Sequence, residues 1–137
     1  MKGSKVILDT NIWVSLFITR RLSKLELLVY QNDLQLLTCH KLIDEMARIV
    51  KHDKIKRYLD EPFEVYIDAH FDLTTFVSIE SRFESSPDPN DNYLFDLALQ
   101  VEADYLVTGD KKLLAMESIE NVQVISLRKF EEMLSGT

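Results

Sequence analysis

Short apolar runs alternate with longer helical patterns along most of this chain. The runs are four or five residues long and rich in β-branched residues and leucine, which is typical of strands buried in a parallel sheet. The segments between them carry apolar residues every three or four positions, as amphipathic helices do. This alternation predicts a three-layer α/β/α sandwich with a mainly parallel, five-stranded sheet.

The predicted elements can be placed by residue number. We expect strands at 5–8, 34–38, 73–77, 104–107 and 122–125. We expect helices at 11–17, 22–30, 40–51, 54–59, 91–101 and 111–115, and a last one that ends near residue 134. A further helix should begin at Pro62 and turn Phe63, Tyr66, Ile67 and Phe71 inward. No internal repeat is visible, so the 137 residues indicate one domain spanning 1–137.

Charge and cysteine content narrow the possible classes of function. The formal net charge is −7, so the chain as a whole does not attract nucleic acid, and such a partner must meet a local basic patch. Cys39 is the single cysteine, which rules out a disulfide within the chain and favours a reducing cytoplasm. No apolar run approaches the length of a membrane span or a signal peptide. We therefore expect a cytoplasmic protein without membrane contact.

Two aspartates follow predicted strands. Asp9 comes directly after the first strand, and Asp110 follows the fourth strand after Thr108 and Gly109. Residues just beyond the carboxyl ends of strands in an open α/β sheet converge on one crevice. Each aspartate alone also suits a turn or a helix cap, but two at the same end of neighbouring strands favour a site. Clustered carboxylates repel one another, and a divalent cation bound through oxygen commonly compensates for this.

Acidic residues on two predicted helices can be assigned to faces from the helical repeat. Asp91 lies in line with the apolar stripe of its helix, although it also suits a helix start, where an acid is stabilised by the dipole. Asp96 falls on the opposite side and should face water. Glu45 borders the apolar face of its helix and Asp44 lies on the far side. An ordinary surface role for Glu45 also fits that position.

Four segments, taken together and in this order, resemble PIN domains. They are 6–11 (VILDTN), 42–50 (LIDEMARIV), 88–92 (DPNDN) and 103–110 (ADYLVTGD). The likeness extends over essentially the whole chain and is closest to a group described as toxin components of prokaryotic toxin–antitoxin systems. Many of these relatives have a glycine where this chain has Glu102, a difference that concerns a helix end.

The resemblance implies a metal-dependent endoribonuclease that cleaves single-stranded or structured RNA, with a sheet of order 3-2-1-4-5. Its catalytic and metal-binding positions correspond to Asp9, Glu45, Asp91 and Asp110. Its supporting polar positions correspond to Thr10, Asn11, Thr108 and Asp96. Such hard oxygen ligands favour Mg²⁺ or Mn²⁺. The implied partners are an RNA substrate, a cognate antitoxin protein and a second copy of the chain in a homodimer.

Basic residues near the acidic segments are candidates for RNA contact. They are Lys51, Lys54, Arg57, Lys111 and Lys112. A run of this kind can equally be a solvated face. Contacts to phosphate would make binding sensitive to salt and indifferent to sequence.

Other classes of protein also gather aspartates at strand ends. An aspartyl-phosphate phosphatase needs a second aspartate two residues after the first, where this chain has Asn11, and no Gly-rich phosphate loop or Ser elbow is present. A non-catalytic PIN-like module that binds RNA or protein stays open.

Histidines and aromatic residues outside these segments suit structural roles. The three histidines, His40, His52 and His70, should have surface or partly buried structural roles. Exposed apolar residues near Trp13, Phe17 and Ile18 could form a dimer surface, and Trp13 could equally belong to the core.

Overall fold

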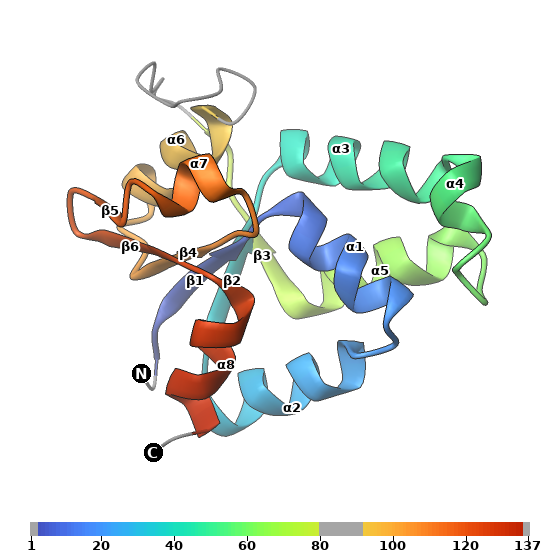
Figure 1. The fold of residues 1–137 in the computed structure, drawn as a ribbon, viewed down its shortest axis with the longest axis horizontal. Coiled ribbons are helices and arrows are strands. Elements are labelled where there is room, and N and C mark those ends of the chain that lie inside the picture. Colours follow the sequence, from blue (N-terminus) through green and yellow to red (C-terminus); the bar gives the residue numbers. More distant parts are fainter. Residues whose placement is uncertain (1–2, 80–91, 136–137) are drawn as a thin grey trace.

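The strands of this protein form one sheet. The computed structural model describes residues 3–79 and 92–135, and within these ranges the sheet has six strands in the order β3-β2-β1-β4-β6-β5 (Figure 1). The strands are β1 (Lys5–Leu8), β2 (Gln35–Thr38), β3 (Thr74–Phe76), β4 (Tyr105–Val107), β5 (Ser118–Ile119) and β6 (Val122–Ile125).

The sheet confirms the expected class and strand order. Neighbouring strands are parallel from β3 to β6, and β6 occupies the fifth place. The additional strand, β5, pairs antiparallel with β6 at the edge, across a two-residue turn at Glu120 and Asn121. A strand of two residues is too short to show an alternating pattern, which is why the sequence did not reveal it.

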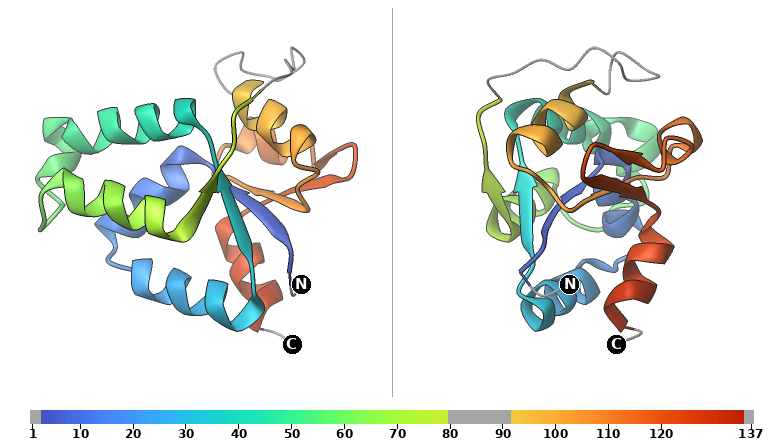
Figure 2. Two further views of the ribbon diagram at one scale, coloured as in Figure 1. Left: turned by 180° about the vertical axis from the view of Figure 1, so that it is seen from behind. Right: turned by 90° about the vertical axis from the view of Figure 1, so that its left-hand side faces the viewer.

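The helices cover both sides of the sheet. They are α1 (Thr10–Ile18), α2 (Leu22–Asn32), α3 (His40–Lys51), α4 (Asp53–Lys56), α5 (Phe63–Leu73), α6 (Asn92–Gln100), α7 (Lys111–Leu114) and α8 (Leu127–Ser135). Helices α1, α3 and α5 gather on one side of the strands, and α6 and α7 lie on the other (Figures 1 and 2). This is the expected sandwich. None of the helices in the described ranges combines the length and the apolarity needed to cross a bilayer.

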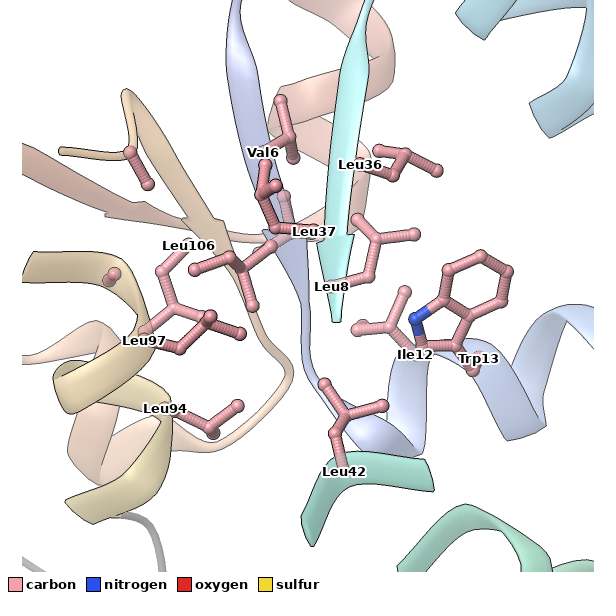
Figure 3. Packing of buried hydrophobic residues seen from close by; sticks show 14 of the residues in the cluster. Val6, Leu8, Ile12, Trp13, Leu36, Leu37, Leu42, Leu94, Leu97 and Leu106 are labelled. Atoms are coloured by element: carbon pink, nitrogen blue, oxygen red, sulfur yellow. The ribbon is translucent and has the colours of Figure 1, made fainter. Parts of the chain in front are cut away.

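The core joins the strands to the helices that carry the candidate acids. Leu8 at the end of β1, Leu42 near the start of α3 and Leu94 in α6 are fully or almost fully buried. Figure 3 shows these side chains among the buried residues around the strands. Trp13 and Phe17 are also buried in this core, so the dimer-surface alternative is wrong for these two residues.

Helix α5 differs from the expectation at one residue. Tyr66 and His70 are its buried residues, whereas Phe71, expected to face inward, is 47% exposed. The hydrophobic pattern favoured Phe71 because histidine is seldom fully buried. His70 is accommodated because its Nε2 lies 2.8 Å from the hydroxyl of Thr38, which supplies a hydrogen-bond partner.

The end of α6 has a backbone conformation that favours glycine. Glu102 has a φ of 54°, in the left-handed region, and the next amide, of Ala103, donates to the carbonyl of Ala98 at 2.9 Å. Glycine is favoured in this region at helix ends. Glu102 therefore affects a helix end, as expected.

Candidate functional site

Asp9 ends β1 and is held by the neighbouring strand. Its amide donates to the carbonyl of Val107 at 2.9 Å, which continues the pairing with β4, and its Oδ2 accepts from the hydroxyl of Thr108 at 2.7 Å. The carboxylate is buried. Burial raises its pKa and the charge of Glu45 raises it further, while the hydrogen bond from Thr108 and the amides of Asn11 and Thr10 oppose the rise. Asp9 is thus a buried acid close to a second acid.

Thr108 connects the two aspartates that follow strands. Its side chain is fully buried, and while its hydroxyl donates to Asp9, its Oγ1 accepts from the amide of Asp110 at 3.1 Å. The structure therefore brings the backbone of Asp110 and the carboxylate of Asp9 to one threonine, as expected from the convergence of strand ends.

Asp110 caps a helix. Its Oδ1 accepts from the amide of Lys112 at 2.8 Å at the start of α7. The alternative role of Asp110 as a helix cap, which the sequence also allowed, is therefore present in the structure. It uses one of the two carboxylate oxygens, so capping and a site role are compatible.

Glu45 reaches the same region from α3. This helix is anchored by the buried residues Leu42, Met46 and Val50 on one face, and Glu45 is half-buried beside them. Its charge raises the pKa of Asp9, which places the two carboxylates within electrostatic reach of each other. Asp44 is exposed on the outer face, as predicted.

A groove of about 470 Å³ opens beside Glu45 and is lined by Lys41, Asp44, Glu45 and Arg48. Lys41 precedes Glu45 by about one helical turn and Arg48 follows it by one. Lys41 is not among the basic residues predicted to contact RNA, although its spacing from Glu45 on the same helix could have indicated that it lies beside that acid.

Tyr93 is a buried member of the site that the sequence analysis missed. It lies in the first turn of α6, and its hydroxyl is 3.1 Å from that of Thr10, the buried residue that follows Asp9. Burial raises the pKa of Tyr93, and the charges of Glu45 and Asp9 raise it further. A tyrosine buried beside acids requires a hydrogen-bond partner for its hydroxyl, and Thr10 supplies one here. The side chain of Asn11, by contrast, is exposed.

The expectation that Asp96 faces water is wrong. Asp96 is 8% exposed, and it lies within an uninterrupted buried stretch, 93–98. The helical repeat separates a core face from a water face only when one side of a helix is covered. Helix α6 is covered on nearly all sides, so the outward side of Asp96 is also enclosed.

The set of four acids stays a prediction. Asp91 lies outside the described residues. Within 3–79 and 92–135, no group of three or more His, Cys, Asp or Glu side chains is close enough to hold a metal ion. The structure places Glu45 within electrostatic reach of Asp9 and links the backbone amide of Asp110 to the carboxylate of Asp9 through Thr108.

The donor chemistry of Asp9 and Glu45 suits a hard cation. Both offer carboxylate oxygens, the ligands that Mg²⁺ and Mn²⁺ prefer. Neither forms an ion pair with another residue of the described ranges. The nearby thiol of Cys39 is buried, and burial raises its pKa, so it stays protonated and is not a competing soft ligand.

The candidate RNA-binding residues are exposed at two places. Lys51, Lys54 and Arg57 lie along the end of α3 and the following α4, and the ammonium of Lys51 stands 4.4 Å from the ring centroid of Phe63. The two remaining residues begin α7, immediately after Asp110, and are Lys111 and Lys112.

The histidines have structural contacts. His40 pairs with Asp44 at 3.1 Å, and His52 accepts from the amide of Lys54 at the start of α4. His70 is fully buried rather than partly buried, because Thr38 satisfies its Nε2.

Comparisons with known proteins agree with this arrangement. A model of the PIN domain family matches residues 5–112. The fold is similar to the crystal structure of VapBC2 from Rickettsia felis bound to a DNA fragment from their promoter, with a TM-score of 0.60 and 16% sequence identity over 89% of this chain and 98% of that chain. At this identity the likeness concerns the fold alone. No curated protein matches the chain.

Proposed function

Because the chain belongs to the PIN domain family, we propose that it is a metal-dependent endoribonuclease that cleaves single-stranded or structured RNA. PIN domains are generally nucleases. The observation that carries the proposal is the buried carboxylate of Asp9, which the hydroxyl of Thr108 holds at 2.7 Å at the end of β1, with the charge of Glu45 within electrostatic reach. Two carboxylates held together at the carboxyl edge of a sheet raise each other's affinity for a cation.

We assign the ligands of a Mg²⁺ or Mn²⁺ ion to Asp9, Glu45, Asp91 and Asp110. When bound, such an ion supplies Lewis-acid polarisation of the scissile phosphate and lowers the pKa of a water molecule for in-line attack. Thr108 orients the carboxylate of Asp9 by donating to its Oδ2. The carboxylate of Asp9 is thus held in place before substrate arrives, which lowers the cost of organising it during the reaction.

Basic residues on two sides of the acidic site suit an RNA backbone. Lys41 and Arg48 line the groove beside Glu45, and Lys51, Lys54 and Arg57 extend the positive charge along α3 and α4. Beyond Asp110, the pair at the start of α7 adds two more charges, from Lys111 and Lys112. Phosphate contacts on both sides would offset the repulsion between RNA and an acidic chain.

The resemblance of the sequence to toxin components extends the proposal to partners. We propose that the protein acts in the cytoplasm as the toxin of a toxin–antitoxin pair, as a homodimer bound by a cognate antitoxin protein. The similar VapBC2 structure contains a fragment of promoter DNA, and an assembly of that kind is compatible with this assignment.

Cleavage of single-stranded RNA by the purified protein tests the proposed activity. With Mn²⁺ or Mg²⁺ the protein should cut internally, and excess chelator should stop the reaction. Asp9→Asn, Asp110→Asn and Asp91→Asn should each reduce the rate by about 100-fold or more, because each removes charge and ligand strength.

A matched control is Asp68→Asn, which removes the same charge from an exposed position on α5. It should leave cleavage unchanged. A folded Asp9→Asn protein that cuts like the wild type would refute the assignment. A wild-type protein that binds RNA but does not cut it with either metal would instead support a non-catalytic module.

A further inference from the structure

Tyr58 leaves a large aromatic side chain in water just beyond the end of α4. It is 54% exposed. The residues around it are anchored, because Ile55 and Leu59 pack against the core and the amide of Tyr58 donates to the carbonyl of Ile55 at 2.9 Å. Single exposed apolar residues are common on proteins, so the surroundings of Tyr58 decide whether it has a role.

A cation stands over the ring of Tyr58. The guanidinium carbon of Arg57 lies 5.1 Å from the ring centroid, within the range of a cation–π contact. The other exposed aromatic rings of residues 3–79 and 92–135, those of Tyr30, Phe71 and Phe76, have no such cation. Tyr58 is therefore distinguished from the other exposed rings by its neighbour.

A second pair of the same kind belongs to this end of the molecule. The ammonium of Lys51 stands 4.4 Å from the ring centroid of Phe63, which joins the end of α3 to the start of α5. Helix α4 lies at the end of α3 remote from the sheet, where the chain turns back into α5 (Figure 1). Aromatic rings and cations thus alternate around this turn.

The positive charge at this turn is not neutralised by ion pairs. Residues 48–58 contain five Lys or Arg and a single acid, Asp53, in a chain whose net charge is −7. Within the described ranges neither Lys51 nor Arg57 forms an ion pair. The acid that follows Tyr58 by two positions, Asp60, is instead bound by Arg20 at 3.4 Å. The local excess of cations favours an anionic partner over a neutral apolar one.

This surface continues from the groove of the acidic site. Arg48 lines the groove beside Glu45, and Lys51 follows Arg48 by about one turn of the same helix. The six positions from Glu45 to Lys51 correspond to about 9 Å along the helix axis. An RNA strand that lies in the groove and continues along α3 therefore comes to the turn that carries Tyr58.

We propose that Tyr58 is a stacking subsite for an unpaired base of this RNA, and that Arg57 and Lys51 contact the phosphates of the same segment. The inference rests on the proposed function of the acidic site. Proteins that hold single strands combine a positive track with aromatic rings on which bases stack, and Arg adds a cation–π contribution. A base inside a duplex has both faces covered by its neighbours, so this subsite accepts an unpaired segment.

Binding of fluorescently labelled oligouridine to the metal-free protein in excess chelator, measured by fluorescence anisotropy, tests the proposal without cleavage. Tyr58→Leu keeps an apolar side chain but removes the ring, and should raise the Kd by about 5-fold or more. Tyr58→Phe keeps the ring and should bind as the wild type does. Tyr30→Leu is a matched control, because it removes an 87% exposed tyrosine from α2, and it should leave the Kd unchanged.

An abasic strand of the same length and charge separates stacking from phosphate contact. Tyr58→Leu should bind the abasic strand as the wild type does, and its slope of log K against log salt should be unchanged, because the ring carries no charge. An equal loss for both strands, or no loss for oligouridine, would overturn the proposal. So would a wild type that does not bind oligouridine, and a protein partner would then be the better occupant of this surface.

The result also separates this inference from the proposed cleavage. If the wild type binds oligouridine with the expected dependence on Tyr58 but does not cut RNA with Mn²⁺ or Mg²⁺, only the proposed cleavage fails. If the wild type cuts RNA while Tyr58→Leu changes neither the Kd nor the KM, only the stacking subsite fails.

Discussion

The buried histidine of α5 should make the stability of this protein depend on pH. His70 is fully buried, its Nε2 lies 2.8 Å from the hydroxyl of Thr38, and its ring meets that of Trp13 edge-on with centroids 4.3 Å apart. Burial lowers the pKa of His70 from 6.5 to about 4, because a charged imidazolium is poorly solvated there. The unfolded chain exposes the ring and restores the ordinary value.

The sign and size of the effect follow from the two pKa values. Above pH 6.5 the imidazole is neutral in both states, and its full contribution to stability is present. As the pH falls from 6.5 to about 4, the imidazole of His70 binds a proton in the unfolded state but stays neutral in the folded state, so the free energy of unfolding decreases. At about 1.4 kcal/mol per pKa unit, the difference corresponds to a loss of about 3 kcal/mol, which levels off below pH 4.

Urea unfolding between pH 7.5 and 4 measures this loss. Carboxylates titrate in the same range, so the informative quantity is the difference between the wild type and His70→Gln, whose amide is uncharged at every pH. The variant should lack the component of about 3 kcal/mol. His52→Gln, at an exposed position, should retain it. Parallel stability curves for the wild type and His70→Gln would refute the reasoning.

Two further outcomes follow from the charges at and near the site. In metal-free protein, Asp9→Asn should raise the melting temperature by about 3 °C per kcal/mol of repulsion relieved. It should also reduce the rise in melting temperature that Mn²⁺ causes in scanning calorimetry, whereas Asp68→Asn should do neither. An Asp9→Asn protein with the wild-type Mn²⁺ response would contradict a shared site. Replacing Lys51, Lys54 and Arg57 together with Ala should weaken single-stranded RNA binding and reduce the slope of log K against log salt by about 2 if all three contact phosphate. An unchanged slope, measured by fluorescence anisotropy, would mean that these residues are only a solvated face.

Much of the architecture could be predicted from local patterns. Strands such as β1 and β4 contain short apolar runs bounded by polar residues, and these patterns need no knowledge of the fold. The positions of Asp9 and Asp110 at one edge then follow, since parallel strands present their carboxyl ends together. Strand β5 could not be predicted because a strand of two residues shows no periodicity.

The wrong assignments of Asp96 and Phe71 share a cause. Asp96 was expected to face water and Phe71 to face inward, because the helical repeat was applied as if each helix were covered on one side and its most apolar residues were buried. In the structure α6 is enclosed nearly all round, and α5 buries His70. Which sides of a helix are covered depends on its neighbours, and the sequence of the helix alone does not contain that information.

The sequence by itself determined the class of fold and two acids at the edge of the sheet, and its resemblance to PIN domains implied the order of the strands. Only the tertiary structure decided how the acids are held, through contacts between residues far apart in the chain. Thr108 and Asp9 are separated by 99 positions, Tyr93 and Thr10 by 83, and His70 and Thr38 by 32. A side-chain hydrogen bond forms only when two elements pack with their polar atoms about 3 Å apart, and no local periodicity encodes that distance.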